Sequence, residues 1–507
     1  MHWIDLTIMA AFLIGCMAFG YLARGKTQHA EDYFTGGGKM TGFLNTVILG
    51  LSIAGTFFSG ISFIIYPSIV YSHSIILPVW GLAVCMPLAF VILRFWFLPR
   101  YLAGKWKYPY EILEDRFGPA SRTVASLLYI CMRIGWMGAM IYAPTLAIIT
   151  MCGLDLHTWF WPLVLANGLT NTFFTVFVGI RGVVVIEAVH MLVIAGGILA
   201  TIISALYQLP VPFSTAISTL YHTNHFKIFD FSFDPRNNLT VFSIVIGTSI
   251  GNLVNYIADQ MSLQRYLASG DGKSASRSFV VNIIGVTIVI SLLTAVGLAL
   301  YVFYHFSNES GVPAKADQVF PHFVSTHLPV GVAGLLLAAL LSANSLPAAI
   351  NTLSSILTVD FHSRLIGRLE GARLAFWAKV YSSLLGVTAT LLAGSMAQLN
   401  NSNLFELTNL LGGMFAGPLL SVVVLATLGV RSTGAAIIPA IVLGWLAGVC
   451  IHFANLAPLW IGPASALTTL LVGFGLSRFI KASPRPHATE DTLEIQAAEP
   501  TPVTATH

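Results

Sequence analysis

The sequence predicts an all-α integral membrane protein with about thirteen transmembrane helices. Of its 507 residues, 56% are hydrophobic and only 9% are charged, and the mean hydropathy is +0.79. A soluble protein carries about 25% charged residues, so 25 basic and 21 acidic side chains are too few to cover a globule of 54.6 kDa. A membrane-spanning helix needs about 20 mostly apolar residues. The composition therefore excludes an ordinary soluble enzyme and leaves room for many spans.

Thirteen apolar segments are long enough to cross a bilayer when the chain is scanned with a window of about 19 residues. The first lacks the basic start and the cleavage site of a signal peptide, so we expect it to be retained as a span. In order, the predicted spans are 4–22, 43–70, 77–97, 124–150, 160–177, 183–206, 241–257, 279–304, 330–357, 374–393, 407–428, 435–452 and 459–479.

The positions of Lys and Arg predict that the N-terminus lies outside and the C-terminus lies in the cytoplasm. In this orientation the inner segments hold 20 of the 25 basic residues, and the outer loops hold only Lys227, Arg236 and Lys315. Basic residues gather on the cytoplasmic side of membrane proteins, so the net charge of +4 does not indicate a nucleic-acid partner. We expect a multi-pass protein of the plasma or inner membrane, with the lipid bilayer as its surroundings.

Two spans carry small and polar residues at their centres. The second reads LSIAGTFFSGISFIIYP and the seventh reads VIGTSIGNLVNYIADQ. Unwound backbone is tolerated in a membrane only where it is buried in protein or lines a cavity. Helices broken at matching places in two halves indicate a transporter with inverted repeats and a site near the midplane. The alternative is that Gly and Ser only allow close helix packing.

The two interrupted segments lie five spans apart, which fits two repeats of five helices. This spacing divides the chain into five parts. We expect an extra N-terminal helix at 1–25, a first repeat at 43–206, a second repeat at 241–428, two further helices at 435–479 and a disordered cytoplasmic tail at 480–507.

Seven groups of residues resemble the sodium:solute symporter family, in the family's order. They are EDYFTGGGKMTGF, FSGISF with YPSIVY, YPYEILEDRFG, VGIRGVVVIEA, DQMSLQRYLAS, AINTLSSILTVDFHSRL and GGMFAGP, and the resemblance runs from about residue 30 to residue 440. It implies a LeuT-type 5+5 inverted repeat, an alternating-access mechanism, and uptake of a small organic solute driven by Na⁺. It implies Na⁺ as the coupling ion, with no organic cofactor, no other metal and no enzymatic activity.

The resemblance also implies a sodium site between the second and ninth spans. The matching backbone carbonyls belong to Gly55, Phe58 and Leu341, and the matching side chains are Asn344 and Ser345. The sequence departs from the family here, since Asn344 stands where a hydroxyl residue is usual and the segment looks two residues short. Ser342 is therefore a competing ligand, and a kinked packing helix with a degenerate ion site is the alternative.

Glu187 lies inside the sixth predicted span, where a carboxylate costs about 2.5–3.5 kcal/mol to insert. It matches a family aspartate linked to sodium passage or to a second sodium. His190, one turn further, shares its helix face and makes proton coupling conceivable, since His titrates near neutral pH. The alternative is a structural pair of Glu187 with Arg181 or His190.

Arg133 in the fourth span is the one arginine that cannot be assigned to a loop. It is a candidate for binding a solute carboxylate, because Arg contacts carboxylates in a bidentate manner; a structural ion pair is the alternative. Hydroxyls, amides and aromatic rings near the predicted midplane complete the solute site. The other candidate solute contacts are Thr56, Ser59, Ser62, Trp136, Tyr142, Asn252 and Asn255.

These observations predict a secondary-active, sodium-coupled symporter that imports a small solute: a sugar, polyol, carboxylate or amino acid. No GxxxxGK[ST] motif for ATP binding occurs, and no HExxH motif occurs. Two alternatives remain at this stage. One is a transporter-like membrane sensor with a degenerate ion site, and the other is a proton-coupled symporter that uses Glu187 and His190.

Overall fold

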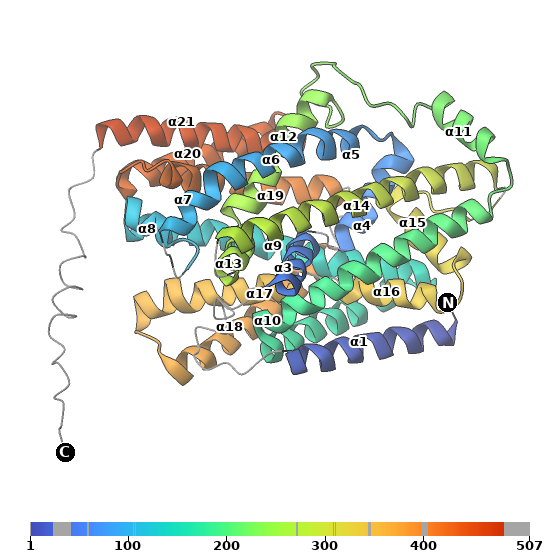
Figure 1. Ribbon diagram of the computed structural model, residues 1–507, viewed down its shortest axis with the longest axis horizontal. Helices are drawn as coiled ribbons and strands as arrows, with labels where there is room; N and C mark the ends of the chain where they lie inside the picture. The colour runs from blue at the N-terminus through green and yellow to red at the C-terminus, as the bar shows by residue number, and fades with distance from the viewer. Residues whose placement is uncertain are drawn as a thin grey trace.

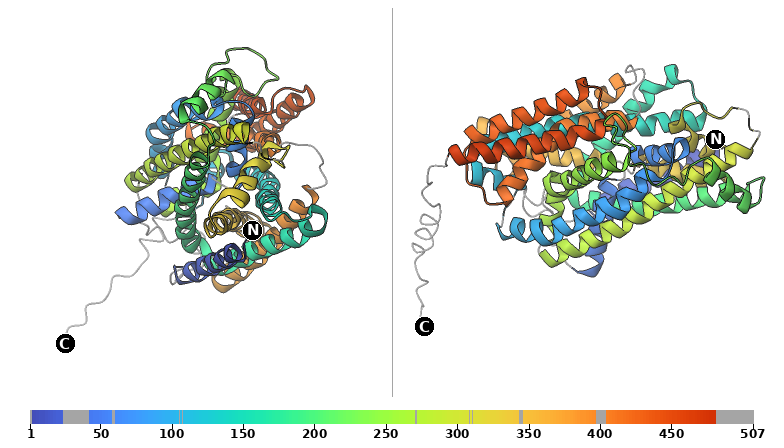
Figure 2. Two further views of the ribbon diagram at one scale, coloured as in Figure 1. Left: turned by 90° about the vertical axis from the view of Figure 1, so that its right-hand side faces the viewer. Right: turned by 90° about the horizontal axis from the view of Figure 1, so that it is seen from above.

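The computed structural model describes residues 2–23, 42–57, 60–104, 106, 108–269, 272–307, 309, 311–342, 346–396 and 404–480. Within these ranges the regular structure is entirely helical, and the long helices run side by side along one direction (Figures 1 and 2). The helices are α1 (Trp3–Ala23), α3 (Phe43–Phe57), α4 (Gly60–Ser72), α5 (Ile76–Trp80), α6 (Met86–Val91), α7 (Leu98–Ala103), α8 (Glu111–Phe117), α9 (Pro119–Cys152), α10 (Leu156–Tyr207), α11 (Phe213–His222), α12 (Val241–Leu253), α13 (Gln260–Ala268), α14 (Gly272–Phe306), α15 (Ala316–His327), α16 (Val332–Ser342), α17 (Leu346–Ser355), α18 (Gly371–Met396), α19 (Leu404–Thr427), α20 (Gly434–Phe453) and α21 (Ile461–Phe479).

Five shorter helical stretches join these elements. Four are π-helical and one is a 3₁₀ turn. They are η2 (Gly81–Cys85), η3 (Ile92–Phe97), η4 (Val254–Ala258), η5 (Ile356–Ile366) and the 3₁₀ turn η6 (Pro458–Trp460).

The structure confirms the all-helical membrane fold. Eight helices of the described part are long and apolar enough to cross a membrane, and shorter apolar helices accompany them. Large apolar side chains such as Phe43 and Phe95 are exposed on the outside of the bundle, as expected of a lipid-facing surface. The number thirteen stays a prediction, because several expected spans occur as two or more shorter helices.

Helix α10 covers two of the expected spans. A straight helix of its 52 residues would be about 78 Å long, more than twice the thickness of the bilayer core. In Figure 1 it doubles back, and its two arms have different neighbours. Gly168 of the first arm packs on Thr390 of α18, whereas Gly197 of the second arm packs on Leu336 of α16.

One expected span ends in a break with extended backbone, and two others contain residues outside the described part. The second consists of α3 and α4, and the ninth consists of α16 and α17, with residues 58–59 and 343–345 outside the described part. The seventh continues as a helix through Gly247 and Gly251, where the sequence suggested a break. It changes to π-helical turns in η4 and breaks at Asp259, whose extended backbone starts α13 and whose side chain accepts a hydrogen bond from the Met261 amide. The capping carboxylate marks this break better than the glycines do.

Helix α1 lies at one edge of the bundle against α10 and α16, and α20 and α21 lie at the opposite edge against α19 (Figure 1). Asp5 of α1 is buried at the start of α16, where its Oδ1 accepts hydrogen bonds from the amides of Gly331 and Gly334 at 2.6 and 3.1 Å. A carboxylate at this position satisfies free amides and complements the helix dipole. Gly334 permits the contact, because a Cβ there would lie 2.3 Å from the Asp5 carbonyl oxygen.

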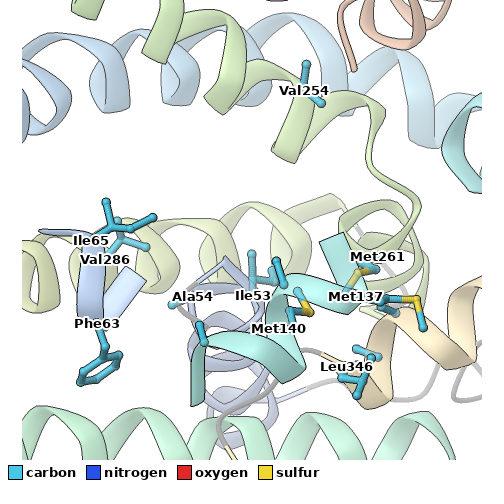
Figure 3. Packing of buried hydrophobic residues seen from close by; sticks show 14 of the residues in the cluster. Ile53, Ala54, Phe63, Ile65, Met137, Met140, Val254, Met261, Val286 and Leu346 are labelled. Atoms are coloured by element: carbon cyan, nitrogen blue, oxygen red, sulfur yellow. The ribbon is translucent and has the colours of Figure 1, made fainter. Parts of the chain in front are cut away.

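The apolar core gathers residues from the ends of the interrupted helices. Figure 3 shows Ile53 and Ala54 of α3, Met140 of α9 and Leu346 of α17 in one region, and all four belong to the same buried cluster. Helix α9 also packs against α4, α16 and α17, and so joins the second and ninth predicted spans.

Candidate functional site

A buried ion pair joins α13 to the second arm of α10. Arg265 donates from Nη2 to Oε2 of Glu187 at 2.7 Å, and both side chains are more than nine-tenths buried. Arg265 also donates from Nη1 to the Met261 carbonyl at 2.8 Å, which fixes the guanidinium on its own helix. Because a charged group buried in a membrane protein is costly unless it is paired, this pair satisfies both charges at once.

Ser52 of α3 completes this cluster. Its hydroxyl donates to Glu187 Oε2 and accepts a hydrogen bond from Arg265 Nε at 3.1 Å. A Cβ on Gly55, one turn further, would lie 3.2 Å from the Glu187 carbonyl oxygen. Helices α3, α10 and α13 therefore meet at Glu187. The other carboxylate oxygen, Oε1, is buried without a hydrogen-bond partner in the described part of the chain.

His190 does not join Glu187, contrary to one alternative drawn from the sequence. Its Nε2 lies 3.5 Å from the Cys16 Sγ, and its ring packs beside Phe12 at a centroid distance of 5.8 Å. His190 therefore faces α1, whereas Glu187 faces α3 and α13. The side chain of Arg181, the other suggested partner, is outside the described part.

A second buried cluster lies at the break between η4 and α13. Arg133 of α9 forms an ion pair with Asp259, and Tyr129 donates from its hydroxyl to Asp259 Oδ1 at 2.9 Å. Arg133 Nε donates to the Tyr129 hydroxyl at 3.3 Å, and its guanidinium lies 4.5 Å from the centre of the Trp136 ring. Arg133 is thus held by a carboxylate and by an aromatic face.

A cavity of about 240 Å³ lies beside this second cluster, between α9, α12, α19 and α21. Arg133, Trp136 and Asn255 line it together, so three of the residues expected to contact a solute come from two helices to one space. Glycines of α12, α19 and α21 form much of the remaining wall. They are Gly247, Gly251, Gly412, Gly413 and Gly462.

Other expected solute contacts lie elsewhere. The Thr56 hydroxyl donates to the Ser52 carbonyl within its own helix at 2.8 Å, and Tyr142 packs edge-on against Phe160. Asn252 and Ser62 are half-buried and are not among the residues that line the cavity. Ser59 lies outside the described residues.

The expected sodium ligands lie mostly outside the described residues or next to them. Phe58, Asn344 and Ser345 lie outside the described residues, and the side chains of Leu341 and Ser342 are likewise not described. The described part of α3 extends to Phe57 and that of α16 extends to Ser342. Gly55 lies against Glu187, two residues before Phe57.

A model of the sodium:solute symporter family matches residues 33–444. The chain belongs to this family. The match covers both buried ion pairs and every expected ion and solute residue. Its relatives are transporters, and the protein is a sodium-coupled symporter of a small solute.

The known proteins that are similar to this chain are named after different solutes. The sodium/sialic acid symporter SiaT of Proteus mirabilis is 25% identical over 461 residues, covering 89% of this chain and 90% of that protein. The sodium/iodide cotransporter of Homo sapiens is 27% identical over 431 residues, covering 83% of this chain and 65% of that protein. The sodium-coupled monocarboxylate transporter 1 of Homo sapiens is 27% identical over 467 residues, covering 90% of this chain and 73% of that protein.

Solved structures agree on the fold. A sodium-coupled sialic acid symporter in a substrate-bound outward-open state has a TM-score of 0.84 at 23% identity, covering 95% of this chain and 99% of that one. The nucleobase-cation-symport-1 family transporter Mhp1, in a closed conformation, has a TM-score of 0.53 at 13% identity, covering 85% of this chain and 91% of that one. The family member described here therefore has a LeuT-like transporter fold.

Arg265 and Asp259 are the site residues that sequence reasoning missed. Both lie in the string DQMSLQRYLAS, which was read only as a family resemblance. A usable signal existed, because Glu187 and Arg133 are charges inside spans and each requires an opposite charge nearby. Asp259 and Arg265 are such charges at the end of another interrupted span.

A third charged cluster, also missed, links α8, α9 and η5. Arg122 donates to Asp360 Oδ1 at 2.5 Å and to Glu114 Oε2 at 2.9 Å, and Ser126 donates to Asp360 Oδ2 at 2.6 Å. Arg364 also donates to Glu114. The cluster ties the short helix α8 to the end of the ninth predicted span and lies away from the 240 Å³ cavity.

Proposed function

We propose that this symporter imports a small organic solute by alternating access and that the transported solute is an anion, with carboxylates as the first candidates. The observation that carries the proposal is the pair of buried arginine–carboxylate contacts beside the interrupted helices. Charges inside a membrane protein are costly and mark ion or substrate paths. Breaks in the helices supply the free backbone oxygens that a hard cation binds.

The coupling Na⁺ would bind between the end of α3 and the end of α16. Gly55, Phe58 and Leu341 would supply carbonyl oxygens, and Asn344 and Ser345 would supply side-chain oxygens, with Ser342 as the alternative ligand. Support comes from helix α9, which packs against α4 of the second predicted span and against α16 and α17 of the ninth. The oxygen-rich ligand set suits a hard cation.

The solute would enter the cavity lined by Arg133, Trp136 and Asn255. Arg133 is neutralised by Asp259, so a bound carboxylate would compete with Asp259 for the guanidinium. Because Asp259 caps α13, such competition would connect solute binding to the break between η4 and α13. Named relatives carry sialic acid, iodide and monocarboxylates, which are all anions and so support an anionic solute.

Glu187 would handle a cation, as a relay or at a second sodium site, through its unpaired oxygen Oε1. Arg265 already neutralises the carboxylate, so full coordination of a second cation would require the guanidinium to move. His190 faces Cys16 on α1 and would take no part, which favours Na⁺ over H⁺ as the coupling ion.

The proposed orientation has the N-terminus outside and the C-terminus in the cytoplasm of a plasma or inner membrane. The distribution of basic residues along the sequence supports it. In this orientation the predicted repeats, 43–206 and 241–428, cross the membrane in opposite senses, as alternating access between inverted repeats requires.

A thermal-shift screen of the purified full chain tests this proposal. Carboxylates, sugars, polyols and amino acids would each be added in NaCl and in KCl. A ligand stabilises the state that it binds, so we expect a carboxylate to raise the unfolding temperature in Na⁺ and to do so far less in K⁺. Stabilisation by sugars alone, or by carboxylates equally in both salts, would contradict the proposal.

A further inference from the structure

A second cavity, of about 710 Å³, lies between η3, α7 and the start of α14, away from the ion pairs and from the smaller cavity. Three basic side chains line it: Arg94, Lys273 and Arg277. Its remaining wall is mostly apolar and includes Leu98 and Leu102. The volume falls within the range of roughly 300–1,000 Å³ that is usual for ligand sites.

The charges of the three cations decide which kind of ligand suits the cavity. Within the part of the chain that the structure describes, none of Arg94, Lys273 and Arg277 forms an ion pair with an acidic side chain. Lys273 and Arg277 are exposed. They lie one turn apart in helix α14. The cavity is therefore suited to an anion.

The surfaces that lead away from the cavity are apolar. On α14 the sequence Lys273, Arg277, Val280, Ile284 and Ile288 advances by four, three, four and four residues, which keeps all five on one helix face. Val280, Ile284 and Ile288 are 40%, 55% and 50% exposed. In a membrane protein, exposed side chains of this kind contact lipid tails.

The neighbouring wall repeats this pattern. Leu88 and Val91 of α6 and Phe95 of η3 are exposed large apolar residues on the approach to Arg94. Each wall thus joins basic side chains at one end to an exposed apolar surface beyond them. A free phosphate would use only the basic end, whereas a phospholipid would use both.

We propose that this cavity binds the head-group phosphate of an anionic glycerophospholipid through Arg94, Lys273 and Arg277, with the acyl chains along the exposed apolar faces of α14 and α6. Basic pockets between transmembrane helices bind such head groups on the cytoplasmic side. The three residues belong to the basic set that predicts the cytoplasmic side of this chain, so the lipid would come from that leaflet. This site is separate from the proposed ion and solute sites.

Lipid retention by the full chain tests the proposal. The protein would be reconstituted in bilayers of phosphatidylglycerol and phosphatidylcholine with identical acyl chains, extracted in mild detergent, and weighed by native mass spectrometry. Each basic residue near an anionic lipid is worth roughly a fivefold gain in binding. We expect the unchanged protein to retain phosphatidylglycerol over phosphatidylcholine by at least about tenfold.

The variant combines Arg94→Gln, Lys273→Gln and Arg277→Gln. Its matched control combines Arg368→Gln, Arg373→Gln and Arg431→Gln, which removes the same charge from exposed positions outside the cavity. We expect the first to lose the preference and the second to keep it. Equal retention by the cavity variant, or equal loss in the control, would overturn the proposal.

Two further measurements distinguish a lipid site from a free-anion site and from a folding defect. Inorganic phosphate at millimolar concentration is added before extraction; release of the lipid by phosphate would show a free-anion site and would also overturn the proposal. If the triple variant does not yield a monodisperse protein, Lys273→Gln and Arg277→Gln are measured singly, because their exposed side chains contribute little to packing. Each single change is then expected to lower the preference about fivefold, and no change in either would overturn the proposal.

Discussion

Arg265 of α13 and Glu187 of α10 form a buried ion pair, with Nη2 and Oε2 2.7 Å apart, on which Ser52 of α3 also converges. Three helices that the sequence separates by more than two hundred residues therefore share one charge-neutral contact. If α3 or α13 moves relative to α10 during transport, this contact must either break or rearrange.

Removing one partner of this pair is expected to destabilise the protein far more than replacing both. Arg265→Met leaves the Glu187 carboxylate buried without its counter-charge, which costs about 3–5 kcal/mol of unfolding free energy, whereas neutralising both partners is often tolerated. We expect the double variant Glu187→Gln with Arg265→Met to be more stable than Arg265→Met alone. Chemical or thermal unfolding in detergent measures this double-mutant cycle.

The exposed pair of Arg368 and Glu370 provides the control for that cycle, since their side chains are 88% and 76% exposed. Its coupling energy should be close to zero. Strictly additive effects at Glu187 and Arg265 would mean that the two side chains do not interact in the folded protein.

Arg133 is expected to set the affinity for an anionic solute. Arg133→Lys keeps the positive charge but loses the planar fork that contacts a carboxylate and stacks on Trp136. The KM for the solute should rise at least about tenfold, the value of one lost bidentate contact, while the Na⁺ concentration for half-maximal uptake changes little.

Arg122→Lys is the matched control, because Arg122 is a buried, paired arginine on the same helix that does not line the cavity. The Arg122→Lys variant should leave the solute KM unchanged in the fraction of the protein that folds. An equal rise of KM in both variants would assign Arg133 a purely structural role.

The register of the sodium site can be decided by two serine substitutions. If Ser345 supplies a ligand oxygen, Ser345→Ala should raise the half-saturating Na⁺ concentration about tenfold or more, because a hard cation loses one of its oxygens. Ser342→Ala should then have little effect, and Ser395→Ala on the exposed face of α18 serves as the control. An increase with Ser342→Ala alone would shift the proposed register, and an increase with neither would remove both from the site.

Glu114 is expected to make stability depend on pH below neutrality. Burial alone would raise the pKa of this α8 carboxyl, but hydrogen bonds and charge from Arg364 and Arg122 outweigh burial and lower its pKa below the ordinary 4.5. The folded state therefore favours the ionised form. Its contribution to stability is present above the ordinary pKa and is lost as the pH falls through the lowered value.

The measurement is the unfolding temperature as a function of pH for the unchanged protein and for Glu114→Gln. The variant should be less stable at neutral pH and should lose less stability between about pH 5 and pH 3. Parallel curves for the two proteins would show that Glu114 has the same pKa in the folded and unfolded states.

The fold could be predicted from the sequence because the membrane imposes simple rules on composition and on charge. The length of the apolar segments and the scarcity of charge were enough to predict the helical membrane fold. The seven groups of residues that resemble the symporter family were enough to predict the family. Helix ends inside the membrane were harder, because the glycines of the seventh span suggested a break that the chain makes only at Asp259. Hydropathy did separate the two arms of α10, of which the second, Val184–Tyr207, is long and apolar enough to cross a membrane by itself.

The candidate site was only partly predictable for a related reason. Glu187 and Arg133 are recognisable one at a time, since each is a charge within an apolar span. Their partners Arg265 and Asp259 lie 78 and 126 positions away along the chain, and only the packing of the folded chain shows which charge meets which. The same packing turned His190 toward α1, which its spacing from Glu187 did not reveal.

Uptake into proteoliposomes is the most direct measurement of the central claim, that a Na⁺ gradient drives solute import. One Na⁺ entering at 100 mV with a tenfold gradient supplies about 3.7 kcal/mol, enough for a solute gradient of about 500-fold. The account predicts that a radiolabelled carboxylate found in the thermal-shift screen accumulates under an inward Na⁺ gradient and not under matched K⁺ or H⁺ gradients. Uptake of that solute at the same rate and to the same level under all three gradients would contradict it.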